Sequence, residues 1–115
     1  MYNFDVEGIE RRASRRFPVN IDLDWEGKIG RQKGTVSDIS MLGCFVLCSG
    51  EVDDGETVKL FLPIDGSMKV QFDALVMNHV FEIGFGAKFV AMNDARTQLL
   101  KKVIDQIGGA NASRI

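Results

Sequence analysis

Four arginines lie within six positions of this sequence: Arg11, Arg12, Arg15 and Arg16. They are four of the seven arginines in a chain of 115 residues. A guanidinium is a planar, permanently charged fork of N–H donors that matches phosphate oxygens and the acceptor edge of guanine, whereas lysine offers only a point charge. Because the run contains no lysine, it favours shaped recognition of an anion or a purine over simple solubilisation.

A second polar group follows at Asp38, Ser40 and Gly43. Asp and Ser side chains cap backbone groups in turns and glycine adopts conformations that other residues resist, so alone this stretch predicts an ordinary turn. A carboxylate also accepts hydrogen bonds from the N–H donors of guanine, a hydroxyl can bind a guanine or phosphate edge, and glycine leaves room for a base. Arginine donors and an aspartate acceptor together match a ligand that carries both phosphate and guanine.

The composition limits the class of partner. A net charge of -2 and a pI near 5.3 argue against a dedicated binder of long nucleic acid, because that affinity comes largely from neutralising many phosphates. A small anionic ligand needs only a local basic patch. No segment approaches membrane-spanning length, and the N-terminus lacks the apolar core of a signal peptide. We therefore expect a cytoplasmic protein without membrane insertion.

Two cysteines and one histidine leave little scope for redox or metal chemistry. Cys44 and Cys48 are four residues apart in an apparent strand, which separates their Cα atoms by roughly 13 Å, too far for a disulfide. We expect both thiols to be reduced. His79 has no other nitrogen ligand to share a metal with, and no nucleophile elbow surrounds Ser40. We expect no metal, no cofactor and no enzymatic activity.

Alternating apolar and polar residues predict the elements that position these side chains. With 45% hydrophobic residues, the chain can form one domain with its own core. The clearest strand starts at Phe17, directly after the arginines. Further strands are expected at about 29–39, with a bulge at Gly34, and at 44–49, 57–63, 68–80 and 83–90. Six strands in close succession imply an antiparallel meander or barrel.

The pattern becomes helical after Asn93, which we predict as an N-cap. Leu100, Val103 and Ile107 recur at helical spacing, and Gly108-Gly109 is expected to end a helix of about 93–107. This helix should cover an open end or edge of the barrel. We expect residues 1–10 to form a flexible lead-in and residues 109–115 a tail.

Arg12 and Arg16, with three residues between them, followed one strand later by Asp38, Ser40 and Gly43, resemble the paired signature of PilZ domains. These domains are bacterial receptors for cyclic di-GMP. Either half of the signature occurs by chance in many chains, but both halves in this order and strand context are specific. The resemblance extends from residue 10 to residue 89 and includes the Arg11-Arg12 doublet, the alternating strand, the glycine-rich stretch 84–89 and the terminal helix.

The resemblance implies an all-β fold with a C-terminal helix, a six-stranded antiparallel PilZ-type split β-barrel, within a domain of residues 11–108. It also implies a cyclic di-GMP receptor that acts through a downstream protein on motility, surface polysaccharide or virulence. In the family the second arginine directly precedes the first apolar strand residue, as Arg16 precedes Phe17. Arg12 and Arg16 therefore take the main roles. The implied ligand-binding set is Arg11, Arg12, Arg16, Asp38, Ser40 and Gly43, extended by Arg15 and Gly86.

The sequence leaves the ligand's stoichiometry and two other functions open. Some family members place an aromatic residue late in the barrel, near the second face of the ligand, whereas residues 76–79 contain no Trp or Tyr. One ligand molecule or an intercalated dimer would each be consistent with that difference. If ligand binds, we expect it to order the arginine segment against the Asp38 turn. The alternatives are a protein-interaction adaptor that no longer binds nucleotide, and an RNA or DNA binder that uses the arginines as an arm.

Overall fold

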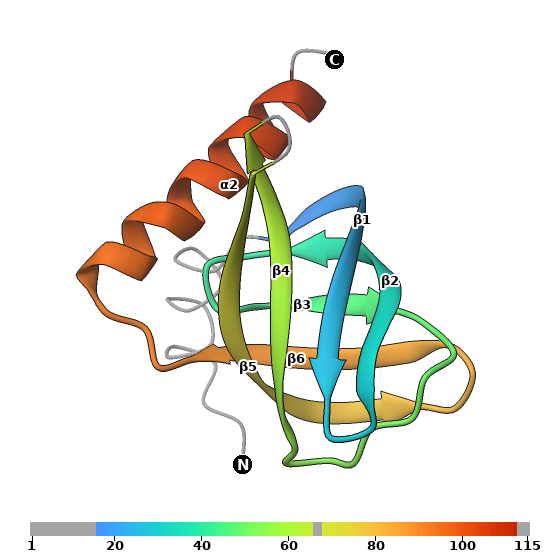
Figure 1. Cartoon of the computed structure of the whole chain (residues 1–115). Coiled ribbons are helices and arrows are strands. Elements are labelled where there is room, and N and C mark those ends of the chain that lie inside the picture. Colours follow the sequence, from blue (N-terminus) through green and yellow to red (C-terminus); the bar gives the residue numbers. More distant parts are fainter. Residues whose placement is uncertain (1–15, 66–67, 113–115) are drawn as a thin grey trace, which may run out of the picture.

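Phe17 opens the first strand of the structure, as the alternating pattern predicts. The computed structural model describes residues 16–65 and 68–112. It contains six strands and one helix, drawn in Figure 1. These are β1 (Phe17–Gly27), β2 (Gly30–Ile39), β3 (Gly43–Leu47), β4 (Thr57–Asp65), β5 (Met68–Val80), β6 (Gly84–Val90) and α2 (Asp94–Ala112).

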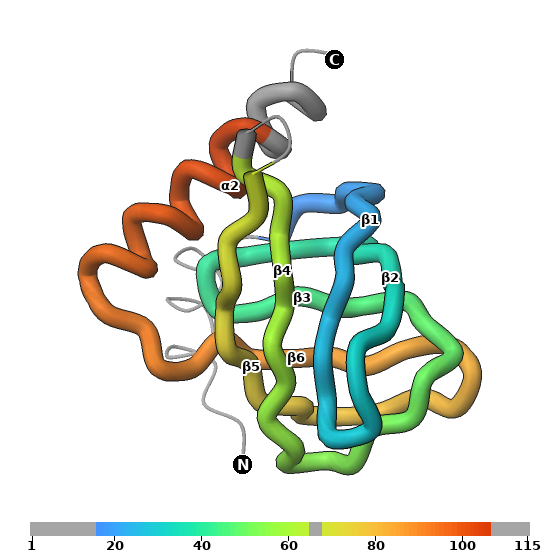
Figure 2. The backbone as a smooth tube through the Cα atoms, viewed as in Figure 1, coloured from blue at the N-terminus to red at the C-terminus, as the bar shows by residue number. Residues whose placement is uncertain are grey.

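The strands form a closed barrel in the order β1-β2-β3-β6-β5-β4, with every neighbouring pair antiparallel. The backbone trace in Figure 2 shows β1 and β4 crossing in front of β3, β5 and β6. β1 and β4 pair only through Asp24–Glu26 and Lys59–Phe61, so the barrel is closed by its shortest ladder at this seam. The predicted six-stranded antiparallel barrel with one C-terminal helix is confirmed.

The core fills the barrel because alternate residues of each strand point inward. Trp25, Leu60, Phe72 and Phe85 come from four different strands, and each is fully buried. The rings of Trp25 and Phe85 meet edge to face, with their centroids 5.0 Å apart. Such aromatic pairs stabilise a fold by about 0.5–1.5 kcal/mol beyond the area they bury.

The helix α2 completes the core at the weak seam. It packs against β4 and β1, and its Leu100, Val103 and Ile104 belong to the same buried cluster as the barrel residues. Asn93 caps the helix, as predicted, because its Oδ1 accepts a hydrogen bond of 2.8 Å from the Arg96 amide. The predicted end at residue 107 is wrong, since the helix continues through Gly108-Gly109 to Ala112.

The predicted bulge at Gly34 is also wrong. Gly34 pairs with Leu23 in regular register, whereas the register shifts between Val36 and Asp38 in β2 and at three other points, in β1, β4 and β5. A Cβ on Gly34 would lie 2.8 Å from Val46 Cγ1, so side-chain packing explains this glycine. Bulges at other positions therefore decide which strand residues face outward.

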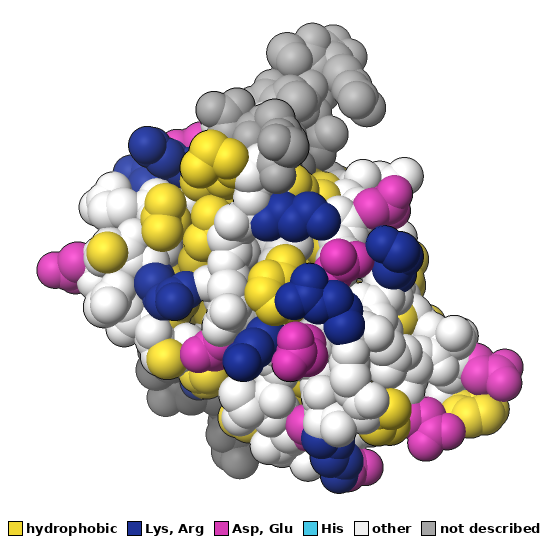
Figure 3. Space-filling view, viewed as in Figure 1, with side chains coloured by type: hydrophobic (Ala, Val, Ile, Leu, Met, Phe, Trp, Pro, Cys, Tyr) yellow, Lys and Arg dark blue, Asp and Glu magenta, His cyan; other side chains and the backbone are white. Residues whose placement is uncertain are grey.

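Charged side chains of both signs are scattered over the face of the barrel shown in Figure 3. Both cysteines are free, as predicted. Among the helical residues that the structure describes, no stretch is long and apolar enough to cross a membrane.

Candidate functional site

Asp38 reaches the outer surface because of a bulge in β2. Val36 pairs with Val46, and Asp38 pairs with Phe45, the next residue along β3. Ser37, between Val36 and Asp38, is therefore the extra residue of the bulge and has no partner of its own in this ladder. Without it, the period of two would place Asp38 on the same face as the buried Val36. The bulge instead leaves Asp38 outside and turns Ile39 into the core.

Arg16 meets Asp38 across the start of the barrel. Pro18 pairs with Asp38 in the β1–β2 ladder, which brings the residue preceding β1 beside the carboxylate. Arg16 Nε donates to Asp38 Oδ1 at 2.8 Å, and Arg16 Nη2 lies 2.5 Å from the same oxygen. The arginine side chain is 54% exposed and the aspartate side chain 33% exposed. The pair is therefore held in one geometry while remaining open to a ligand.

Ser40 organises the turn between β2 and β3. Its hydroxyl oxygen accepts hydrogen bonds from the amides of Leu42 at 3.1 Å and Gly43 at 3.2 Å, and the Ser40 amide donates to the Gly43 carbonyl at 2.8 Å. The residue is fully buried. The structure thus gives this hydroxyl a clear part in the turn that follows Asp38.

Gly43 is required by the approach of β6 to β3. A Cβ at this position would lie 2.1 Å from the carbonyl oxygen of Ala87, which is far inside van der Waals contact. A Cβ at Gly86 would instead meet Asn78 Oδ1 at 2.5 Å, which is the end of an exposed side chain. The two glycines therefore differ: one is fixed by backbone packing and the other only by the side chain above it.

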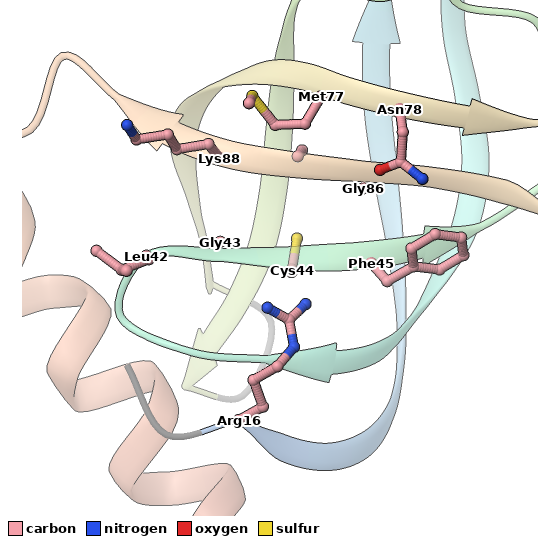
Figure 4. A pocket seen from close by; sticks show the side chains of 10 residues that line it. Arg16, Leu42, Gly43, Cys44, Phe45, Met77, Asn78, Gly86 and Lys88 are labelled. Carbon is pink, nitrogen blue, oxygen red and sulfur yellow. The ribbon is translucent and has the colours of Figure 1, made fainter. Parts of the chain in front are cut away.

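A pocket of about 370 Å³ lies on the outside of the barrel wall. Arg16, Gly43 and Gly86 line it. In Figure 4 the guanidinium of Arg16 points from the start of β1 toward β3, and the side chain of Asn78 extends from β5 over Gly86 of β6. Asp38 sits at the Arg16 border through the ion pair. The structure therefore brings Arg16, Asp38, Gly43 and Gly86 to one place, with the Ser40 turn beside them.

Seven of the ten residues that line the pocket were not in the predicted set, and Met77, Asn78 and Lys88 are among them. Val76 pairs with Ala87 and Asn78 with Gly86, so Met77 is the extra residue of a bulge in β5. This bulge leaves both Met77 and Asn78 exposed above the pocket. The exposure of Lys88 follows from the alternation of strand residues, because its neighbour Ala87 is buried. Of the three residues, Lys88 is the one whose outward direction could have been predicted from the sequence.

Arg11, Arg12 and Arg15, which belong to the predicted ligand-binding set, lie outside the described residues.

A second concave site of about 200 Å³, on β1, β2 and β5, is lined by Asp22, Asp24, Lys33 and Lys69. Lys33 and Lys69 lie within 3.2 and 3.7 Å of Asp24, so their charges are already balanced. Within the described parts of the chain, no group of three or more His, Cys, Asp or Glu side chains could hold a metal ion.

Burial controls the chemistry of Cys44 beneath the pocket. Desolvation, reinforced by the negative charge of Asp38 and partly offset by Arg16, raises the pKa of the Cys44 thiol to about 12. Since the thiolate is the reactive form, we expect iodoacetamide to leave Cys44 unmodified in the native protein at mildly alkaline pH. Mass spectrometry after brief labelling should detect alkylation first at Cys48, which is only half-buried. Rapid labelling of Cys44 without denaturant would contradict the packing described here.

The same shift has a consequence for stability. The native pKa of Cys44 lies above the reference value of 9.0, so above that pH the unfolded chain loses this proton before the native protein does. Its contribution to stability is therefore complete below pH 9.0 and falls as the pH rises toward 12. Urea unfolding of the wild type and of Cys44→Ala should show a steeper alkaline loss for the wild type.

The PilZ domain family model matches residues 10–106 of the chain. No curated protein has a significantly similar sequence. Among solved structures, the PilZ domain of YcgR from Escherichia coli, solved with c-di-GMP, aligns with a TM-score of 0.75 at 13% identity. That alignment covers 90% of this chain and 96% of the YcgR domain.

Two further structures share the fold. The PilZ domain of CeSA from a cellulose-synthesizing bacterium aligns with a TM-score of 0.65 at 20% identity, covering 85% of this chain and 99% of that one. The MrkH–c-di-GMP complex of K. pneumonia aligns with a TM-score of 0.64 at 16% identity. It covers 82% of this chain but only 50% of MrkH. At these identities the likeness is one of architecture.

Proposed function

The chain belongs to the PilZ family, and from that premise we propose that it is a cyclic di-GMP receptor whose ligand binds in the pocket beside Arg16 and Asp38. The observation that carries the proposal is the Arg16–Asp38 pair at the border of that pocket. The pair places a cationic donor beside an anionic acceptor. The donor matches a phosphate or the acceptor edge of guanine, and the acceptor matches the N–H donors of guanine.

Each part of the site has a distinct task. Arg16 donates to a phosphate or to guanine O6 and N7, joined by Arg12 with Arg11 in support and Arg15 as an additional donor. Both contacts that Arg16 makes with Asp38 use Oδ1, so we expect Oδ2 to accept from guanine. Ser40 holds the turn, and Gly43 and Gly86 keep side chains off the pocket floor.

The energetics support this assignment. Charge-assisted hydrogen bonds are worth about 1.5–3 kcal/mol each. Four or five of them amount to about 6–15 kcal/mol. With stacking on a base, the upper part of this range reaches the roughly 8 kcal/mol of micromolar affinity after association and ordering costs. Arg16 alone cannot reach that value. The proposal therefore requires the preceding arginines to join the site.

Ligand binding would hold the segment 11–15 against the Asp38 turn, because Arg16 links that segment directly to the pocket. The held segment changes the surface that the domain offers to a downstream protein, which is how a receptor without catalytic groups can transmit occupancy. Hydrogen exchange tests this step. Amides of residues 11–15 should gain protection when cyclic di-GMP is added, and unchanged exchange there at saturating ligand would rule the step out.

Calorimetry tests the proposal as a whole. Cyclic di-GMP, GTP and a short oligonucleotide are titrated separately into the wild type and into Asp38→Ala. We expect micromolar or tighter binding of the cyclic dinucleotide alone, weakened at least tenfold by the substitution, since one charge-assisted acceptor is lost. Tight, strongly salt-dependent binding of the oligonucleotide would favour a nucleic-acid arm instead. If none of the three compounds bound, the protein-interaction adaptor that does not bind nucleotide would be the remaining hypothesis.

A further inference from the structure

The end of the β5–β6 hairpin and the neighbouring end of β3 expose four large apolar side chains. Phe81 is 71% exposed and Ile83 53% exposed, and Val80 and Leu47 are also exposed. Leu47 belongs to this group because it pairs with Gly84, the first residue after the turn. Single exposed apolar residues are common on proteins, but a contiguous group indicates a contact surface. We call these four residues the apolar tip.

The turn between β5 and β6 contains residue types that are unusual in tight turns. The Ile83 amide donates to the Val80 carbonyl at 2.9 Å, so Phe81 and Glu82 are the two central residues of a tight turn. Such positions usually carry Gly, Asn, Asp, Ser or Pro. Glu82 has φ of 60°, in the left-handed region that costs a non-glycine residue roughly 1–2 kcal/mol. A phenylalanine presented to solvent on a strained turn adds nothing to the core.

Acidic residues surround the apolar tip. The Cys48 amide donates to the Ile83 carbonyl at 3.0 Å, which ties the β3–β4 loop to the hairpin. The loop residues 48–56 and the turn residues 80–83 contain no lysine or arginine. In the lower right of Figure 3, apolar and acidic side chains protrude next to one another. The acidic residues of the two segments are Glu51, Asp53, Asp54, Glu56 and Glu82.

Two of these carboxylates are already engaged by Lys28. Its ammonium pairs with Asp53, and its amide donates to Glu56 Oε2 at 2.9 Å. Glu51, Asp54 and Glu82 stay exposed around the apolar tip. Their like charges disfavour both a second copy of this end and an anionic lipid surface. A partner with the opposite charge fits the surface.

We propose that the apolar tip is the docking site for another protein, which receives Phe81 in an apolar pocket bordered by lysine or arginine. Phe81 is the anchor because a protruding aromatic side chain buries the most area on contact. Glu82, Glu51 and Asp54 steer the basic border of the partner and fix its orientation. This inference does not depend on whether the pocket beside Arg16 binds cyclic di-GMP.

Site-specific photo-crosslinking in the native host tests the proposal. Benzoylphenylalanine is placed at position 81 and, as a matched control, at the 63% exposed Met68 on the β4–β5 side of the barrel. We expect a heterologous protein adduct from position 81 and none from position 68. No adduct at position 81, equal adducts at both positions, or an adduct only with a second copy of the chain would each overturn the proposal.

The captured protein is then purified and titrated with the whole chain. Phe81→Ser should weaken binding about thirtyfold, as expected for a hot-spot aromatic. Glu82→Lys should weaken it mainly through slower association, and added salt should reduce the difference between Glu82→Lys and the wild type. Met68→Ser should leave the affinity unchanged. Binding that survives Phe81→Ser, or Phe81-dependent flotation on phosphatidylglycerol vesicles, would reject this partner class.

Both tip variants change exposed side chains, so each should melt within a few degrees of the wild type. If Phe81→Ser were to unfold, Glu82→Lys would still test the surface, because it reverses a charge without removing a packed group.

Discussion

Arg16→Ala is expected to abolish binding of cyclic di-GMP in calorimetry while the barrel stays folded. Arg16 presents a guanidinium at the border of the pocket, already oriented by two contacts to Asp38 Oδ1. Losing two charge-assisted donors at about 1.5–3 kcal/mol each lowers affinity by a hundredfold or more. Because the Arg16–Asp38 pair is exposed, its own contribution to stability is at most about 1 kcal/mol.

Arg31→Ala is the matched control for this prediction. The Arg31 side chain is 55% exposed, close to the 54% of Arg16, but its guanidinium lies over the Phe61 ring, 4.1 Å from the centroid. It borders neither Asp38 nor the pocket. Removing Arg31 changes the net charge equally and should leave ligand affinity within twofold of the wild type. Equal losses from both variants would mean that only overall charge matters.

Gly43→Ala is expected to destabilise the whole domain. The new Cβ would lie 2.1 Å from the Ala87 carbonyl oxygen, and a backbone atom cannot move aside without separating β3 from β6. Overpacking of this kind costs about 1–3 kcal/mol, and the direct backbone clash places Gly43→Ala at the upper end of that range. Urea unfolding should show a lower midpoint with an unchanged slope.

Gly86→Ala separates folding from ligand binding. Its Cβ would come closer than van der Waals contact only to the end of the exposed Asn78 side chain, which can rotate away. We expect stability within about 0.5 kcal/mol of the wild type, as for surface substitutions, together with weaker binding of cyclic di-GMP because the methyl group intrudes on the pocket. If Gly86→Ala were as destabilising as Gly43→Ala, the contrast drawn between the two glycines would be wrong.

The architecture could be predicted from the sequence because the strands alternate regularly. The pattern after Phe17 gives β1, and the buried Trp25 falls on the apolar face that the alternation indicates. The Asn93 cap was equally readable, since a cap needs only its own side chain and the next turn. These features are local, so one sequence is enough to locate them.

The bulges could not be predicted in the same way. Ser37 and Met77 are ordinary strand residues, and nothing in their types marks them as the extra residue in a ladder. Their bulges decide that Asp38 faces Arg16 and that Asn78 lies over Gly86. The composition of the pocket wall therefore depends on the pairing of strands distant in sequence, which alternation alone does not specify.

The end of the helix was predicted wrongly from a local sequence signal. Gly108-Gly109 predicts a stop, because each glycine costs a helix about 1 kcal/mol relative to alanine. The helix nevertheless continues to Ala112. Glycine lowers the stability of a helical turn without forbidding it, so a glycine pair is a weaker boundary than a capping side chain such as Asn93.

The central claim is that cyclic di-GMP binds on the wall between the β2–β3 turn and β5. A two-dimensional NMR titration of isotope-labelled protein with this ligand tests it most directly, because amide shifts locate the contact residue by residue. We predict that the largest shifts cluster at Arg16, at Asp38 through Gly43, and at Asn78 and Gly86. Shifts centred instead on Asp24 and Lys33, or none at saturating ligand, would contradict the account.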